Sequence, residues 1–324
     1  MRTNKKGSII KKIIITLLCL FLIIVVSGGT YFYLQLSKVK KVKLPSNPSE
    51  LGISKKNDQK LSKYKDIYNI AFFGIDSRQK DDAGRSDTIM ILTLDGKHDQ
   101  VKLSSIMRDT YVKVDGHGMT KITHAYAYGG PQLALKTINE NFNLNIKDFI
   151  TVDFFDCEKI IDKLGGVTIN ITPDELKYIN SYIDEVSKLE KKPTEHVTKA
   201  GAQLLDGRQA VAYSRIRYTA GGDYERTERQ RTVLSALLNK IRSKGASNFS
   251  SVANTLLPYI KTNLNQLEIV NYGLKAFTVK TNGILQHRFP EDSVSNGIMK
   301  DGVWYLQTDL TKTTNEMQKF IFQK

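Results

Sequence analysis

The sequence predicts a layered α/β or α+β domain that follows a single transmembrane helix near the N-terminus. Two features of the 324 residues carry this prediction: one long apolar segment near the start, and short β-rich runs that alternate with helical patterns afterwards. The expected strands are residues 68–75, 88–94, 101–106, 149–154 and 167–171. The expected helices are residues 132–142, 156–164, 173–189, 206–213 and 225–243.

The apolar segment, residues 13–34, reads IIITLLCLFLIIVVSGGTYFYL and contains no charged residue. About 20 such residues cross a bilayer, and aromatic side chains end the run where the membrane interface would lie. A cleaved signal peptide is the alternative, but the run is long and no Ala-x-Ala site follows it. Lysines flank both ends, so charge alone does not set the orientation. We expect residues 1–12 in the cytoplasm, an uncleaved single-pass anchor at 13–34, and an extracellular remainder.

Residues 35–67 are rich in Lys, Ser, Asn and Pro and show no sustained period, so we expect an extracellular stalk there. The folded domain is then expected to cover residues 68–324. Within it, Thr172 and Glu175 have the spacing of a capping box, and Pro173 stands between them. This pattern predicts a helix that begins at Pro173.

Composition limits the class of partner. The chain has 48 Lys and Arg against 33 Asp and Glu, a formal charge of +15. A basic chain meets anions, which here means nucleic acid, anionic lipid or a phosphate-rich substrate. Cys19 lies in the apolar run and Cys157 is the other cysteine, so an intradomain disulfide is excluded. The histidines and cysteines show no zinc-ligand spacing, and neither a Gly-x-Ser-x-Gly elbow nor a phosphate-binding glycine loop occurs.

Polar residues concentrate in four islands: residues 74–78, 85–87, 108–110 and 215–231. The first and third follow expected strands, and the second directly precedes one. Ligands of open α/β sheets bind at strand ends, so three Arg/Asp pairs placed there indicate a binding site. For any single pair, an exposed ion pair of little energetic weight is the alternative.

The fourth island reads RIRYTAGGDYERTERQR. If its start is extended, Arg215 and Arg217 share one face. If Asp223 caps the next helix, Arg226 and Gln230 are i and i+4 on one helix face. A planar guanidinium group can donate two parallel hydrogen bonds to phosphate oxygens, and carboxylate oxygens are ligands that Mg²⁺ prefers. The pattern therefore predicts a diphosphate bound together with a divalent metal.

Seven segments with a common order and spacing resemble the extracytoplasmic domain of LytR–CpsA–Psr proteins. They are NIAFFGIDSR, GRSDTIMILTL, LSSIMRDTYVKV, KITHAYAYGG, IDKLGGVTINI, LLDGRQAVAYSRIRY and GGDYERTERQR, and they cover roughly residues 68–240. The resemblance implies a phosphotransferase that moves a glycopolymer from an undecaprenyl pyrophosphate carrier to the muramic acid 6-hydroxyl of peptidoglycan, assisted by Mg²⁺. It also implies a three-layer αβα domain with a central mixed sheet and an apolar tunnel for the lipid.

The resemblance assigns roles residue by residue. The implied Mg²⁺ ligands are Asp76 and Asp87. The implied catalytic residues are Asp76, Arg108 and Arg226, with Asp76 as either general base or metal ligand. The implied substrate-binding residues are Arg78, Arg85, Arg108, Arg215, Arg217, Asp223, Arg226 and Gln230. The chain departs from the family pattern at Met107, where Pro is usual, and at Thr123-His124, where Asn-Ala is usual.

Two other functions compete with transfer: a non-catalytic wall or lipid-binding anchor, and a membrane-bound transcriptional regulator. The metal carboxylates argue against the anchor, because binding alone does not need them. The regulator lacks any recognition-helix or RNA-binding signature, and an outside domain cannot reach DNA, so we expect no nucleic-acid partner. The expected partners are a carrier-linked glycopolymer, peptidoglycan and membrane lipid. The residues do not select among teichoic acid, capsule and other wall glycans.

Overall fold

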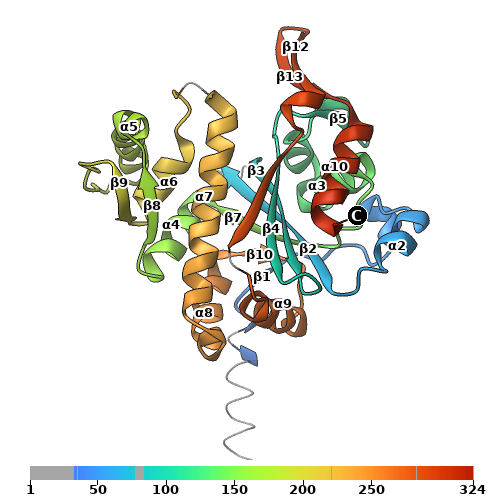
Figure 1. Ribbon diagram of the computed structural model, residues 1–324, viewed down its shortest axis with the longest axis horizontal. Coiled ribbons are helices and arrows are strands. Elements are labelled where there is room, and N and C mark those ends of the chain that lie inside the picture. The colour runs from blue at the N-terminus through green and yellow to red at the C-terminus, as the bar shows by residue number, and fades with distance from the viewer. Residues whose placement is uncertain (1–32, 35, 77–83, 220, 282, 324) are drawn as a thin grey trace, which may run out of the picture.

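The computed structural model describes residues 33–34, 36–76, 84–219, 221–281 and 283–323. Its centre is a mixed sheet of seven strands in the order β1-β10-β7-β2-β3-β4-β11 (Figure 1). These strands are β1 (Lys40–Lys41), β10 (Lys261–Thr262), β7 (Asp148–Asp153), β2 (Ile67–Asp76), β3 (Arg85–Asp95), β4 (Gln100–Ile106) and β11 (Ile284–Phe289). The central strand β2 pairs antiparallel with β3 and parallel with β7.

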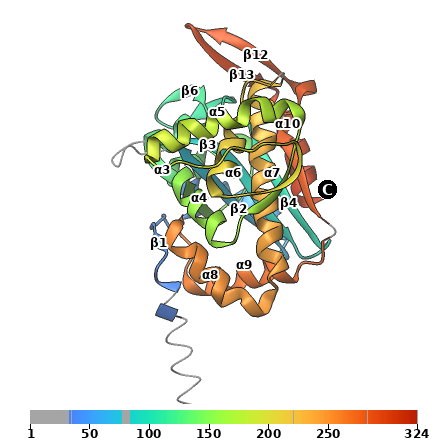
Figure 2. The same ribbon diagram turned by 90° about the vertical axis from the view of Figure 1, so that its left-hand side faces the viewer.

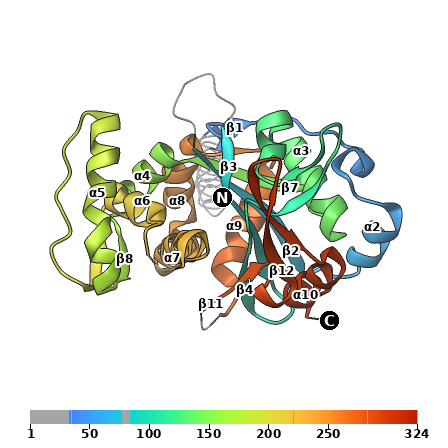
Figure 3. The same ribbon diagram turned by 90° about the horizontal axis from the view of Figure 1, so that it is seen from above.

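Helices cover both faces of the sheet, as Figure 3 shows from above. One face packs against α3 (His124–Phe142) and α10 (Leu310–Phe322). The other faces α4 (Phe154–Lys163), α6 (Gly207–Arg215) and α7 (Gly222–Ser243), with α5 (Pro173–Glu190) outside α6. The predicted α/β domain, with helices on both sides of a mixed central sheet, is confirmed.

The remaining elements lie at the two ends and the edges of the molecule. The helices α8 (Phe249–Leu256) and α9 (Gln266–Thr278) lie at the end where the described chain begins (Figures 1 and 2). Three small two-stranded sheets pair β5 (Tyr111–Val114) with β6 (Gly118–Lys121), β8 (Val167–Ile171) with β9 (Gly201–Leu205), and β12 (Ser295–Lys300) with β13 (Val303–Thr308). The short helix α2 (Lys55–Leu61) precedes β2, and the 3₁₀ turns are Pro48–Leu51, Ala246–Asn248, Leu257–Tyr259 and Asp292–Val294.

Local sequence signals explain where several elements begin. Thr172 and Glu175 form the predicted capping box, with Pro173 as the first residue of α5. The five predicted strands all form, although residues 167–171 pair with β9 outside the central sheet. The helix predicted at 132–142 begins earlier, at His124, and is kinked at Gly129–Gly130 just before Pro131. Gly130 has a φ of 60° and a ψ of −154°, which glycine adopts readily, so Pro131 opens the second helical stretch of α3, close to the predicted start.

The prediction that residues 35–67 form a stalk is wrong for the residues that the structure describes. Lys40 and Lys41 pair with β10 at the edge of the central sheet. Leu36 and Val39 are buried with α8 and α9, and Leu51 and Ile53 are buried as well. Isolated apolar residues at irregular spacing show no period, yet their burial holds this segment on the domain.

The predicted anchor at 13–34 lies outside the described residues, apart from Tyr33 and Leu34, which are helical. Across the described ranges, no helix combines the length and the apolar character that crossing a bilayer requires.

Candidate functional site

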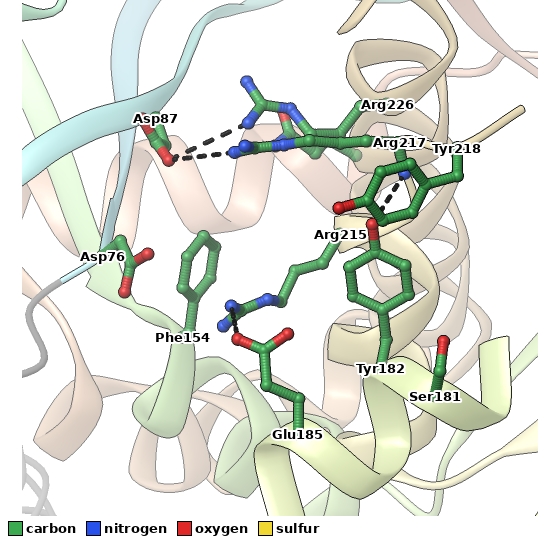
Figure 4. Close-up of a pocket in the computed structure, with 11 residues that line it drawn as sticks. Asp76, Asp87, Phe154, Ser181, Tyr182, Glu185, Arg215, Arg217, Tyr218 and Arg226 are labelled. Atoms are coloured by element: carbon green, nitrogen blue, oxygen red, sulfur yellow. Dashed lines mark hydrogen bonds and ion pairs between the residues drawn. The ribbon is translucent and has the colours of Figure 1, made fainter. Parts of the chain in front are cut away.

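A polar pocket of about 300 Å³ lies between one end of the central sheet and the helices α5, α6 and α7 (Figure 4). The polar pocket is lined by Asp76, Asp87, Phe154, Ser181, Tyr182, Glu185, Arg215, Arg217, Tyr218, Arg226 and Gln230. Asp76 ends β2 and Asp87 lies near the start of the antiparallel β3, so the register of these two strands brings both carboxylates to the same end of the sheet.

Asp87 is surrounded by three arginines, Arg108, Arg217 and Arg226, which we call the arginine clamp. Arg108 donates to Asp87 at 2.8 Å, while Arg217 and Arg226 approach the other carboxylate oxygen at 3.8 and 3.9 Å. Burial by itself would raise the pKa of Asp87, but the three positive charges outweigh it and hold the pKa below its usual value. Asp87 is therefore ionised at neutral pH.

Arg226 is the most deeply buried member of the clamp, with its side chain only 2% exposed. Burial lowers its pKa to about 10, while the carboxylate of Asp223, 3.0 Å away, opposes this shift. The guanidinium therefore stays cationic at neutral pH. Its buried Nε has no hydrogen-bond partner, so the group retains donor capacity.

Asp223 does not cap α7, contrary to the prediction. The cap position belongs to Gly221, and Asp223 is the second residue of the helix. Its carboxylate lies between two clamp arginines, 3.4 Å from Arg108 and 3.0 Å from Arg226. Asp223 thus holds these guanidinium groups near each other despite their like charges. Arg226 and Gln230 both line the pocket from one face of α7, as predicted.

Arg215 and Arg217 do not form the extended pair that the sequence predicted, because Arg215 is the last residue of α6. Arg215 donates to Glu185 at 2.8 Å, whereas Arg217 turns towards Asp87 (Figure 4). The backbone N–H of Arg217 donates to the Tyr182 hydroxyl at 3.1 Å. Both arginines still line the polar pocket, from opposite sides of a bend in the chain.

Arg85, another predicted binding residue, is not among the described residues that line the polar pocket. It is exposed at the start of β3, opposite Asp76 in the strand register. Arg78 lies outside the described residues. Asp109, next to the clamp, pairs with Arg108 at 3.4 Å and with Lys121 at 2.6 Å.

An apolar cavity adjoins the polar pocket and shares Phe154 and Gln230 with it. It is enclosed by the sheet face opposite α3, together with α4, α6 and α7. Its lining residues are Phe72, Gly74, Thr88, Met90, Val152, Asp153, Phe154, Cys157, Ile160, Val211, Ser214, Gln230, Val233, Leu234 and Leu237. Burial raises the pKa of the Cys157 thiol to about 12, so this thiol stays protonated and unreactive.

Two carboxylates of the polar pocket, Asp76 and Asp87, offer ligands for a hard cation. Within the described ranges, no group of three or more His, Cys, Asp or Glu side chains could hold a metal by itself. Mg²⁺ commonly takes one or two protein carboxylates and completes its coordination with water and substrate phosphates. The donor set thus fits a Mg²⁺ that binds together with a phosphate substrate.

Comparison with known proteins decides the family. The model of the LytR_cpsA_psr family matches residues 28–319. The chain belongs to this family. A polyisoprenyl-teichoic acid–peptidoglycan teichoic acid transferase, TagU of Enterococcus faecalis, is 29% identical over 97% of both chains. The corresponding transferase TagT of Bacillus subtilis is 31% identical over 82% of this chain and 81% of its own. A Staphylococcus aureus relative named regulatory protein MsrR is 33% identical over 68% of this chain and 61% of its own.

Solved structures of TagT share the fold. TagT bound to LI-WTA has a TM-score of 0.63 at 28% identity, over 80% of this chain and 92% of the other. TagT with bound octaprenyl pyrophosphate lipid has a TM-score of 0.59 at 27% identity, with the same coverage.

Two departures from the pattern of LytR_cpsA_psr proteins have local explanations. Met107 is buried beside the site, and its sulfur accepts a hydrogen bond from Thr227 of α7 at 3.6 Å. His124 begins α3 and bonds Thr120 at 2.8 Å. Burial, followed by the charges of Arg85 and Lys121, lowers the pKa of His124, so its ring is neutral at pH 7.

Sequence reasoning missed the contribution of α5 to the pocket, which consists of Ser181, Tyr182 and Glu185. These residues belong to an amphipathic helix with no recognisable motif, and only the packing of α5 against α6 brings them to the site. No local sequence signal could have found them.

Proposed function

We propose that this protein is a phosphotransferase of cell-wall biogenesis, which moves a glycopolymer from a polyisoprenyl pyrophosphate carrier to a muramic acid 6-hydroxyl of peptidoglycan. One observation carries the proposal: a pocket rich in arginine adjoins an apolar cavity, and Phe154 and Gln230 line both. This junction fits a ligand with an anionic head and a long apolar tail. The names of the TagU and TagT relatives, and the octaprenyl pyrophosphate bound to TagT, support the same substrate class.

The clamp suits the pyrophosphate. Arg108, Arg217 and Arg226 surround a single carboxylate, so an arriving diphosphate can take over guanidinium donors that Asp87 holds only at 3.8 and 3.9 Å. Charge that develops on the phosphate oxygens during transfer meets donors already in place, which is the main source of catalysis in phosphoryl transfer. The leaving group is a polyisoprenyl phosphate, whose charge the same arginines neutralise.

The apolar cavity receives the isoprenoid. Its free space in this structure is about 70 Å³, too small for a long isoprenoid chain. Binding therefore requires cavity side chains to change rotamer or α7 to move away from the sheet. Each isoprenoid methylene that becomes buried contributes about 0.8 kcal/mol to the binding free energy, which offsets the cost of this opening.

Asp76 and Asp87 are the proposed Mg²⁺ ligands. When bound, Mg²⁺ neutralises charge on the phosphate oxygens. Asp76, at the end of β2, is the carboxylate that either holds this ion or accepts the proton of the attacking sugar hydroxyl. A non-catalytic anchor needs neither a metal ligand nor a general base. An activity assay on variants of these carboxylates therefore distinguishes a transferase from an anchor.

The proposal is tested by comparing the transfer rate of Arg226→Lys with that of a matched control variant. Lysine keeps the charge but not the two-pronged donor geometry, so the transfer rate should fall by about 10² to 10³. Arg231→Lys is the control, because Arg231 lies on the same helix, is also buried, and bonds Ser105 instead of lining the polar pocket. The assay follows polymer moving from lipid-linked donor to purified peptidoglycan. Equal rates for both variants would remove Arg226 from the site, and carrier binding without turnover by the unmodified protein would favour the anchor.

The metal assignment has its own test. Asp87→Asn should leave the circular-dichroism spectrum unchanged but lose most of the transfer, because a neutral amide is a weaker ligand for a hard cation. Chelation of the unmodified protein should mimic this loss. A wild-type rate for Asp87→Asn would refute the assignment.

We also propose that residues 13–34 anchor the protein in the cell membrane, with residues 1–12 in the cytoplasm and the domain outside. The support is the uncharged apolar run and its length. Protease added to wall-stripped cells should digest the chain after Lys43 and leave a protected N-terminal fragment. Digestion only after lysis would contradict this topology.

A further inference from the structure

The β12–β13 hairpin projects from the domain at the end opposite to α8 and α9 (Figures 1 and 2). Its turn residues Asp301 and Gly302 have φ of 51° and 75°, the conformation of a tight two-residue turn that matches the twist of the strands. The hairpin pairs over six positions, from Ser295↔Thr308 to Lys300↔Val303. It is therefore an ordered arm rather than a loose loop.

One face of the hairpin is fixed to the domain. Tyr305 packs against Tyr111 of β5 with ring centroids 4.7 Å apart, and Lys300 donates to the Tyr111 hydroxyl at 2.9 Å. Lys121 lies 5.8 Å from the centroid of the Tyr305 ring. These contacts, together with the fully buried Leu306 at the root, hold the arm at a fixed angle.

The other face carries Met299, Trp304 and Gly297 beyond the buried Leu306, because side chains alternate along a strand. Trp304 is 39% exposed and Met299 66% exposed. A Cβ on Gly297 would stand 2.8 to 3.1 Å from three atoms of the indole, so the ring lies across the bare glycine backbone. The glycine gives the indole a flat support and leaves its outer surface to solvent.

The root of the hairpin adjoins the arginine clamp. The N–H of Leu306 donates to the carbonyl of Asp109 at 2.9 Å, and Thr110 forms a parallel bridge with Leu306. Asp109 directly follows Arg108 of the clamp. The arm is thus continuous, through one residue, with the site where the phosphate is proposed to bind.

We propose that the Trp304 face of the β12–β13 hairpin binds the acceptor glycan strand of peptidoglycan. This inference rests on the proposed function, because the acceptor is then a wall polysaccharide. A pyranose ring presents a face of C–H groups that packs on an exposed indole, while its hydroxyl rim stays hydrated. Supported flat by Gly297, the indole is oriented before the glycan arrives, which reduces the entropy lost on binding.

The first test uses the fluorescence of Trp304, the single tryptophan of the chain. The full-length protein in detergent is titrated with a β-1,4-linked oligomer of N-acetylglucosamine. A saturable blue shift is expected, with none from an α-1,6-linked glucan of equal length. If neither sugar shifts the emission maximum of Trp304, the proposal is wrong.

The second test separates the acceptor from the carrier. With stripped peptidoglycan as acceptor, Trp304→Ala should raise the acceptor KM at least tenfold while kcat and carrier binding stay unchanged. Gly297→Ala keeps the indole but displaces it, and should raise the same KM. The control is Leu267→Ala on α9, since Leu267 is 82% exposed at the opposite end of the molecule.

Each remaining outcome is decisive. If Trp304→Ala behaves like Leu267→Ala, the hairpin is not the acceptor site, although the proposed function stands as long as Arg226→Lys abolishes transfer. If Trp304→Ala changes the oligomeric state and not the acceptor KM, the face is a contact between copies of this chain. If Arg226→Lys transfers at the control rate, the proposed function fails whatever the hairpin does.

Discussion

The two faces of the central sheet are built from the same strands but differ in packing. On the side of α3 and α10, Ala71 and Phe73 are fully buried in a continuous core. On the side of α7, the intervening residues Phe72 and Gly74 line the apolar cavity. Because side chains alternate along β2, one strand serves stability on one face and leaves space on the other. The comparison indicates that the α7 side, which contains the apolar cavity, is the one available for a ligand.

The largest effect should separate Phe73 from its neighbour Phe72. The Phe73 ring packs on Tyr126 and Phe149, with centroids 5.3 and 6.4 Å apart. Phe73→Ala should lower the free energy of unfolding by about 3–5 kcal/mol. Phe72→Ala should cost only about 1–2 kcal/mol, because Phe72 already faces free space. Urea unfolding of the full-length protein in detergent measures both, and equal costs would show that the two faces are equally packed.

Much of this difference is readable from the sequence, but not all of it. Short apolar, β-rich runs predicted β2, β3 and β4, and the Arg/Asp islands at their ends predicted Asp87 and Arg108 as partners in a site. These signals are local, so they survive without knowledge of the fold. The contribution of Tyr182 and Glu185 is not local, because it depends on how α5 packs on α6.

The errors have equally specific causes. The segment 35–67 resembled a stalk because its buried residues, such as Val39 and Ile53, are single and unevenly spaced. Asp223 resembled a helix cap, but α7 begins at Gly222 and leaves its carboxylate free to bind two arginines. In both cases a tertiary contact decided between conformations that the local sequence allows.

A smaller effect should follow from filling the cavity. Val233 on α7 is 6% exposed and lines it, so Val233→Phe places a ring where the isoprenoid is proposed to lie. Carrier affinity should fall about tenfold or more, which corresponds to about 1.4 kcal/mol. Thr168→Phe, at an exposed position of β8, adds similar volume away from the cavity and serves as control. Unchanged affinity in Val233→Phe would place the lipid elsewhere.

The smallest effect should be the pH dependence of stability that Asp87 contributes in the polar pocket, on the α7 side of the sheet. Burial would raise its pKa, but the charges of Arg108, Arg226 and Arg217 prevail and lower it. A carboxyl whose folded pKa is depressed adds stability at pH values above its unfolded pKa of about 3.9, and this contribution is lost as pH falls towards the folded pKa. Asp87→Asn should therefore cost about 1 kcal/mol at pH 7, since the amide oxygen can still accept a hydrogen bond from Arg108.

The difference in unfolding free energy between Asp87→Asn and the unmodified protein should shrink as pH is lowered from 5 to about 3, because the unfolded state of the unmodified protein takes up a proton at Asp87 before the folded state does. Glu50→Gln, at an exposed carboxylate in the 3₁₀ turn Pro48–Leu51, is the control. Urea unfolding at pH 7, 5, 4 and 3 measures the gap. A gap that stays constant over this range would mean that the clamp does not stabilise the ionised carboxylate. The α7 side of the sheet would then lack the preformed anion site that distinguishes it from the side of α3 and α10.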